Sequence, residues 1–177
     1  KATVAGGSSV PILPANLTLK YANGEPRLMS YESLAEGGFA TGTMLGSGGF
    51  IAFDEDQCIV RNTWNFARFY HHESCGQCSP CREGTGWMEK ILHKLEHGHG
   101  TSADIYLLWD VQRKIEGNTI CPLGDAAAWP VASAIRHFRD EFEWHVKEPN
   151  KSQTQNYGIA NYANPIEKKE EEVKSQN

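Results

Sequence analysis

Residues 73–95 decide the fold, and they read ESCGQCSPCREGTGWMEKILHKL. Three thiols, those of Cys75, Cys78 and Cys81, stand at positions i, i+3 and i+6 of this stretch. Apolar side chains at the spacing of an amphipathic helix come directly after them, namely Trp87, Met88, Ile91, Leu92 and Leu95. The stretch therefore predicts a loop that presents three sulfur atoms, joined to a helix that ends at the glycines near residue 100.

The same helical spacing predicts three further helices on either side of this stretch. One begins after Asp54–Asp56, whose negative charge suits a helix N-terminus, and has its apolar stripe between Ile59 and Tyr70. Another begins at Thr101 or Ser102 and ends at Gly117. A fourth has Pro130 in its first turn and an apolar stripe that reaches Val146. Short connections between four helices predict a four-helix bundle over residues 54–148.

Residues 1–53 have a different character, with short strand-like fragments between glycine-rich turns. The fragments are Ala2–Val4, Pro11–Leu13, Leu17–Leu19 and Phe50–Phe53, and residues 29–35 are expected to form a short helical turn. So few strands rarely close a core, so this β-rich domain is expected to be incomplete. The overall prediction is an α+β fold, followed over residues 149–177 by a polar tail that lies mobile or against a partner.

The composition excludes several classes of protein. The chain has 177 residues, 40% of them hydrophobic, and a net charge of -5. These values are typical of a globular domain, and the acidic balance without a basic cluster argues against nucleic-acid binding. No apolar run approaches the roughly 20 residues that a membrane-spanning helix needs, so no direct membrane insertion is expected. The sequence begins at Lys1 without a basic and then apolar leader, so no secretory signal is expected.

The cysteines indicate a metal site in a reducing compartment. Their number is five, which cannot pair completely into disulfides within the chain. The fourth thiol of interest, Cys121, is followed by Pro122 at the entrance to the predicted fourth helix. A C-x2-C-x2-C triplet with a remote C-P is typical of the ligands of a 4Fe-4S cluster, because thiolate is the soft ligand that each iron needs. Nearby Gly76, Gly84 and Arg82 would favour such an anionic cluster.

Other interpretations of the same residues remain open. The thiols of Cys75, Cys78, Cys81 and Cys121 would also suit a zinc ion that holds the bundle together in a non-catalytic interaction module, although zinc sites usually use two pairs of cysteines. A thioredoxin-like redox pair lacks its βαβ context. Cys58 is expected to be a buried structural thiol, and His71 and His72 are close enough in sequence to tune a cluster.

Three stretches carry a resemblance to a known family: ESCGQCSPCREGT (residues 73–85), CPLGDAAAWP (residues 121–130) and RHFRDEF (residues 136–142). They resemble the C-terminal part of the NADH-binding flavoprotein subunit of respiratory complex I, the NADH:quinone oxidoreductase. Related flavoproteins of NAD-linked hydrogenases and formate dehydrogenases share these motifs. The resemblance runs from about Lys1 to Val146 and implies that residues 1–53 are part of a β-grasp domain of the soluble-ligand-binding type.

The resemblance also implies a function. In that family FMN and NADH bind in an N-terminal domain that this sequence does not contain, so the chain by itself is not expected to oxidise NADH. The 4Fe-4S cluster, held by Cys75, Cys78, Cys81 and Cys121, would take single electrons from the flavin and pass them to further iron-sulfur clusters toward quinone. The implied partners are the missing FMN- and NADH-binding domain and other iron-sulfur subunits. The implied location is peripheral, on the cytoplasmic side of a bacterial inner membrane or the matrix side of the mitochondrial one.

Overall fold

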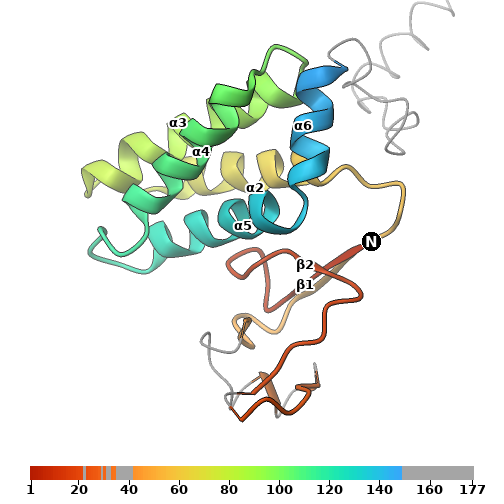
Figure 1. Ribbon diagram of the computed structural model, residues 1–177. Helices are drawn as coiled ribbons and strands as arrows, with labels where there is room; N and C mark the ends of the chain where they lie inside the picture. The colour runs from red at the N-terminus through yellow and green to blue at the C-terminus, as the bar shows by residue number, and fades with distance from the viewer. Residues whose placement is uncertain (22, 29, 31–32, 35–41, 149–177) are drawn as a thin grey trace, which may run out of the picture.

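The computed structural model describes residues 1–148 except 22, 29, 31–32 and 35–41. A small sheet lies beside a group of helices, as Figure 1 shows. The strands are β1 (Ala2–Ala5), β2 (Leu13–Pro14) and β3 (Phe50–Phe53), and the helices are α2 (Ile59–Glu73), α3 (Ser79–Glu96), α4 (Ser102–Ile115), α5 (Leu123–His137) and α6 (Arg139–Lys147). Among the described residues no helix is long and apolar enough to cross a membrane. The predicted tail over residues 149–177 lies outside the described part.

Four of the helices pack in a closed ring. Helix α2 contacts α3, α3 contacts α4, α4 contacts α5, and α5 returns to α2. Each buries the apolar stripe that its sequence predicts, and α4 begins with a capping box between Thr101 and Asp104. Helix α6 lies across one end of the ring (Figure 1). The ring thus leaves its other end to the connections before α3 and before α5.

The prediction of a single fourth helix with Pro130 in its first turn is wrong. Helix α5 already begins at Leu123, so Pro130 lies inside it, and the chain breaks at Phe138 before α6 starts. Pro130 itself does not end the helix, and the Ser133 hydroxyl donates a hydrogen bond of 3.0 Å to its carbonyl oxygen. The apolar spacing runs on through the break because both helices bury that face, with Phe142 fully covered. Periodicity alone could not distinguish one long helix from two short ones.

The start of α2 also differs from the prediction. The helix begins at Ile59 with Cys58 as its N-cap, and its first turn holds no acidic residue. Asp54 and Asp56 instead belong to the turn after β3, where the Asp54 carboxylate accepts a hydrogen bond of 3.1 Å from the Asp56 backbone N–H. An aspartate that satisfies its own turn in this way competes with helix formation, which explains the later start.

The sheet has the strand order β2-β1-β3, and both neighbours of β1 are antiparallel to it. In this register Ala2 lies opposite Pro14 on one side and Phe53 on the other. The predicted strand at residues 17–19 is wrong: these residues have no strand geometry, and only Lys20 forms an isolated bridge, with Pro26. Of the predicted turn at residues 29–35, Ser33 and Leu34 are helical, while residues 29, 31–32 and 35 lie outside the described part.

One continuous apolar core joins the sheet and its loops to the helices. Val4, Val10 and Ile12 are completely buried together with the apolar faces of α2 and α5. At this contact the backbone N–H of Ile12 donates a hydrogen bond of 2.8 Å to the buried Ser133 hydroxyl of α5. The sheet therefore fixes the position of α5, whose first turn follows directly on Cys121.

Candidate metal centre

The three clustered thiols lie at the N-terminus of α3. Cys75 is exposed in the preceding loop, Cys78 is the N-cap residue, and Cys81 in the first turn is buried. Gly76 has a φ of 77°, a left-handed conformation that turns the chain between the first two cysteines. Pro80 occupies the start of the helix, where its missing N–H costs nothing. The sulfurs thus lie where the free backbone N–H groups of a helix favour negative charge.

Polar side chains brace this loop. The Ser74 hydroxyl lies 3.3 Å from the Cys81 sulfur and accepts a hydrogen bond from the Gly76 backbone N–H. The Arg82 guanidinium donates a hydrogen bond of 3.0 Å to the Gly76 carbonyl oxygen, and its other side pairs with Glu83 at 2.9 Å. Arg82 therefore holds the shape of the loop in addition to supplying the positive charge that the sequence predicted.

The segment of Cys121 meets this loop although it lies far away in the sequence. The backbone N–H of Ile120 donates a hydrogen bond of 3.4 Å to the Cys78 sulfur, across 42 residues. Within the segment, the Thr119 hydroxyl donates to the Cys121 carbonyl oxygen at 2.9 Å. Asp125 joins it to the end of α4, because its carboxylate accepts a hydrogen bond of 2.6 Å from the Gly117 backbone N–H. The fold thus brings the remote cysteine to the same end of the helix ring as the triplet (Figure 1).

The spacing of the four sulfurs bears on what they can hold. In the described part of the chain, no three of the thiols of Cys75, Cys78, Cys81 and Cys121 lie within 4.8 Å of one another. A zinc ion bound by four thiolates at about 2.3 Å would place its sulfurs ~3.8 Å apart. The arrangement therefore suits a larger, polynuclear centre better than a single ion.

This centre has one open and one covered side. Cys75 and Cys121 are exposed, and Ile120 beside them is 84% exposed, whereas Cys81 faces the helices and is 8% exposed. Glu73, Gln77 and Pro122 are exposed as well. The two loops therefore leave their outer side accessible to another protein part.

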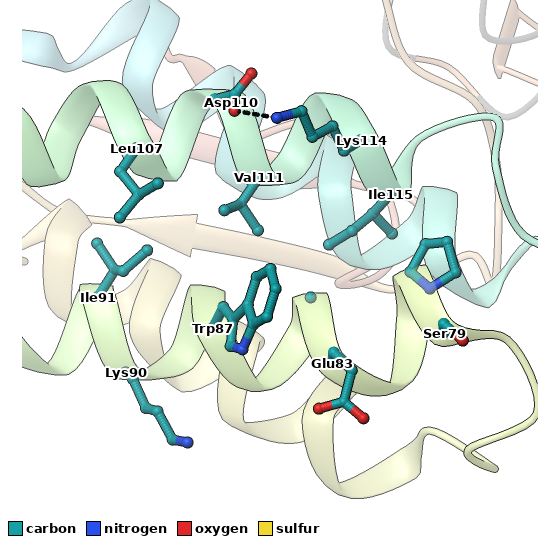
Figure 2. Close-up of a pocket in the computed structure, with 12 residues that line it drawn as sticks. Ser79, Glu83, Trp87, Lys90, Ile91, Leu107, Asp110, Val111, Lys114 and Ile115 are labelled. Atoms are coloured by element: carbon teal, nitrogen blue, oxygen red, sulfur yellow. Dashed lines mark hydrogen bonds and ion pairs between the residues drawn. The ribbon is translucent and has the colours of Figure 1, made fainter.

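A groove leads away from the cysteine loop between α3 and α4. It begins at Ser79 and Pro80, has a volume of about 530 Å³, and is lined mainly by apolar side chains (Figure 2). Trp87 lies over it and is 54% exposed, although its place in the helical stripe predicted a core residue. At this helix position the ring packing leaves a gap, which no local pattern in the sequence signals.

The histidines near the loop have other contacts. His71 pairs with Glu89 of α3 at 2.5 Å, and His72 lies 3.9 Å from Glu73. His93 and His97 stack on one another with ring centroids 3.9 Å apart, beside Trp64. The role of His71 and His72 in tuning a cluster therefore has no support in these hydrogen bonds.

Cys58 is the buried thiol that the sequence predicted, and it has two neighbours that no sequence pattern signals. Its sulfur lies 3.2 Å from His145 Nε2 and 3.8 Å from Glu96 Oε2. Burial, together with the Glu96 carboxylate, raises the pKa of the Cys58 thiol. Burial likewise raises the pKa of Glu96 to about 7 and lowers the pKa of His145 to about 4. This second group of donors lies at the opposite end of α2 and α3 from the cysteine loop.

Comparison with known proteins identifies the helical part. Residues 61–145 match the NADH-ubiquinone oxidoreductase-F iron-sulfur binding region. The chain is 42% identical over 153 residues to an F-type NADH-quinone oxidoreductase subunit of Rhizobium meliloti (strain 1021), covering 86% of this chain and 33% of that protein. It is 44% identical over 160 residues to the F-type NADH-quinone oxidoreductase subunit of Rickettsia typhi, covering 90% of this chain and 34% of that protein.

Solved structures agree with the sequence relatives. A crystal structure of an NAD+-reducing [NiFe]-hydrogenase in the H2-reduced state matches with a TM-score of 0.65 and 29% sequence identity, covering 82% of this chain and 23% of that one. The chain therefore spans about one third of the curated relatives that it matches. Residues 61–145 contain all four of the clustered and remote cysteines, and they belong to the family of NADH-ubiquinone oxidoreductase-F iron-sulfur binding regions.

Proposed function

We propose that this chain is the electron-transfer module of an NADH:quinone oxidoreductase, in which Cys75, Cys78, Cys81 and Cys121 hold a 4Fe-4S cluster that takes single electrons from a flavin outside the chain and passes them to further iron-sulfur clusters toward quinone. The observation that carries the proposal is the hydrogen bond from Ile120 N–H to the Cys78 sulfur, because it joins the segment of the remote thiol to the triplet. The match to an iron-sulfur binding region agrees with this assignment.

The donor set fits an iron-sulfur cluster in chemistry and in charge. Thiolates are the ligands that the irons of such clusters take, and the cluster with its thiolates is an anion. The N-terminus of α3, the Ile120 N–H and the Arg82 guanidinium all place positive potential at this site. The sulfur spacing argues against the alternative of a structural four-thiolate zinc ion.

The residues of this chain would position the centre and control its exposure. Cys81 and the first turn of α3 cover it from the side of the helices, where apolar side chains keep water away. The exposed loops around Cys75 and Cys121 form the side at which a flavin domain could approach. A flavin converts the two-electron chemistry of NADH into single electrons, so a one-electron carrier must lie next to it.

The remaining assignments follow from the relatives. The chain spans only one third of an F-type NADH-quinone oxidoreductase subunit, so the FMN- and NADH-binding part of such a protein would be its first partner. Other iron-sulfur subunits would accept the electrons. A peripheral position on the cytoplasmic or matrix side of the membrane would complete the assembly.

Anaerobic reconstitution with iron and sulfide tests the proposal. We expect iron and sulfide in equal amounts, a brown protein that bleaches on reduction, and an electron paramagnetic resonance signal from the reduced sample. Single serine variants of Cys75, Cys78, Cys81 and Cys121 should lose most of the cluster. The matched control is Cys58→Ser, which changes the fifth cysteine and should keep the cluster. Zinc without sulfide in the purified protein, or full loading of the Cys121→Ser variant, would contradict the proposal.

A further inference from the structure

Three buried donor atoms from three helices meet at the end of the molecule away from the cysteine loop. Cys58 caps the start of α2, Glu96 is the last residue of α3, and His145 lies in α6. The Cys58 sulfur is 3.2 Å from His145 Nε2 and 3.8 Å from Glu96 Oε2, and the latter two atoms are 3.9 Å apart. The exposed fractions of Cys58, Glu96 and His145 are 1%, 3% and 1%.

We propose that Cys58, Glu96 and His145 form a second metal site, which binds one divalent cation of the zinc class. The proposal depends only on these residues and not on the iron-sulfur assignment. Sulfur, imidazole nitrogen and carboxylate oxygen are all ligands of zinc, whereas magnesium and calcium prefer oxygen alone.

The distances suit a tetrahedral ion. Zinc binds sulfur at about 2.3 Å and nitrogen or oxygen at about 2.0–2.2 Å, so the edges of its tetrahedron measure ~3.4–3.6 Å. The three observed separations lie within a few tenths of an ångström of these edges. The fourth position is free for a water molecule, as in other zinc sites that have three protein ligands.

The charges suit the site as well. A Cys58 thiolate and a Glu96 carboxylate would together neutralise a divalent ion, so the complex could be buried without net charge. Without an ion, burial favours the neutral form of each group, as the shifts in pKa described above indicate. In that state His145 Nδ1 is buried without a hydrogen-bond partner, and no placement of the imidazole proton satisfies both ring nitrogens.

The surrounding charged groups are already engaged elsewhere. The nearby Glu141 carboxylate accepts a hydrogen bond of 2.9 Å from the Ile59 backbone N–H and pairs with Lys1 Nζ at 3.1 Å. It is therefore a structural neighbour and not a fourth ligand. The bound ion would join the start of α2 to the end of α3 and to α6, and so hold the end of the helix ring that has no cysteine loop (Figure 1).

Cobalt binding in a background without the four clustered and remote thiols tests the site. In the variant with Cys75, Cys78, Cys81 and Cys121 all changed to Ser, we expect one Co²⁺ per chain. Its spectrum should show the charge-transfer band of a single thiolate and the visible bands of a tetrahedral ion, and zinc should displace it. Changing Cys58→Ser or His145→Asn in this background should weaken binding by more than ~100-fold, and Glu96→Gln by ~10-fold or more.

The matched control is Glu141→Gln, which makes the same chemical change at the neighbouring buried carboxylate and should leave cobalt binding intact. Zinc X-ray absorption on the native, cluster-loaded chain gives a second measurement that does not depend on the folding of any variant. We expect one sulfur and two or three lighter ligands around zinc. A shell of four sulfurs, no zinc uptake, or equal losses in Glu96→Gln and Glu141→Gln would overturn the proposal.

Discussion

Gly84 of α3 lies directly against Ile115 of α4, so close that a Cβ atom on Gly84 would meet Ile115 Cδ1 and Cγ1 at 2.7 Å. Ile115 is 1% exposed and has little room to move. The glycine follows the cysteine triplet by one helical turn, and Ile115 precedes the segment of Cys121. This contact therefore sets how closely the two cysteine-bearing segments approach.

Replacing Gly84 with alanine should loosen this end of the helix ring. We expect Gly84→Ala to lower the free energy of unfolding by about 1–3 kcal/mol, because overpacking outweighs the better helix propensity of alanine. Urea unfolding of the cluster-loaded chain under argon measures the change. In an Ile115→Ala background, where both crowding atoms are gone, Gly84→Ala should cost much less; equal costs in both backgrounds would rule out the steric explanation.

Removing the Ile120 N–H should change the reduction potential of the proposed cluster. Hydrogen bonds to the sulfurs stabilise the more negative reduced state, so their loss lowers the potential. We expect Ile120→Pro, which lacks the N–H that reaches Cys78, to have a lower potential than Ile120→Ala, which keeps it. A redox titration followed by electron paramagnetic resonance compares the two. Identical potentials in two fully loaded variants would show that this hydrogen bond has no influence.

Cluster loss should also destabilise the helices. A group that binds only the folded chain contributes its binding energy to folding, so Cys121→Ala should lower the thermal unfolding midpoint as it loses iron. Circular dichroism at rising temperature gives the midpoint. The control Ile120→Ala changes the adjacent, 84% exposed side chain and should leave the midpoint unchanged. Native stability in iron-free Cys121→Ala would contradict the prediction.

The start of α4 should show a pH dependence that comes from Asp104. Burial raises the pKa of this carboxyl, but hydrogen bonds from Lys94 and Thr101 outweigh it and hold the pKa below its ordinary value of 3.8. The stabilisation is therefore present above about pH 3.8 and is lost as the pH falls through the lower pKa of the folded state. Asp104→Asn should cost about 1 kcal/mol at neutral pH and less in acid, measured by hydrogen exchange of the α4 amides. A cost that stays constant with pH would argue against this role.

The hydrogen bond between the sheet region and α5 should be equally measurable. Ser133→Ala leaves the buried N–H of Ile12 without an acceptor, so we expect a loss of about 1–3 kcal/mol in the free energy of unfolding. Ser102→Ala, at the exposed first position of α4, is the matched control and should have little effect. Similar losses in both variants would mean that the Ile12 contact is not special.

Local features of the fold could be predicted from the sequence alone. The bounds of α3 and α4, the cap at Thr101 and the loop with Cys75, Cys78 and Cys81 each depend on residues a few positions apart. Helical periodicity, capping chemistry and ligand spacing act over that range. The burial of Cys58 was also predicted, because free cysteine is usually buried.

Only the tertiary structure decided which distant residues meet. Cys58 lies 38 residues from Glu96 and 87 from His145, and no local pattern links them. Trp87 repeats with the core residues of α3 but lies over an open groove, and the stripe through Phe142 belongs to two helices instead of one. Periodicity reports which face of a helix is apolar, whereas the packing of all helices and the sheet determines what covers that face.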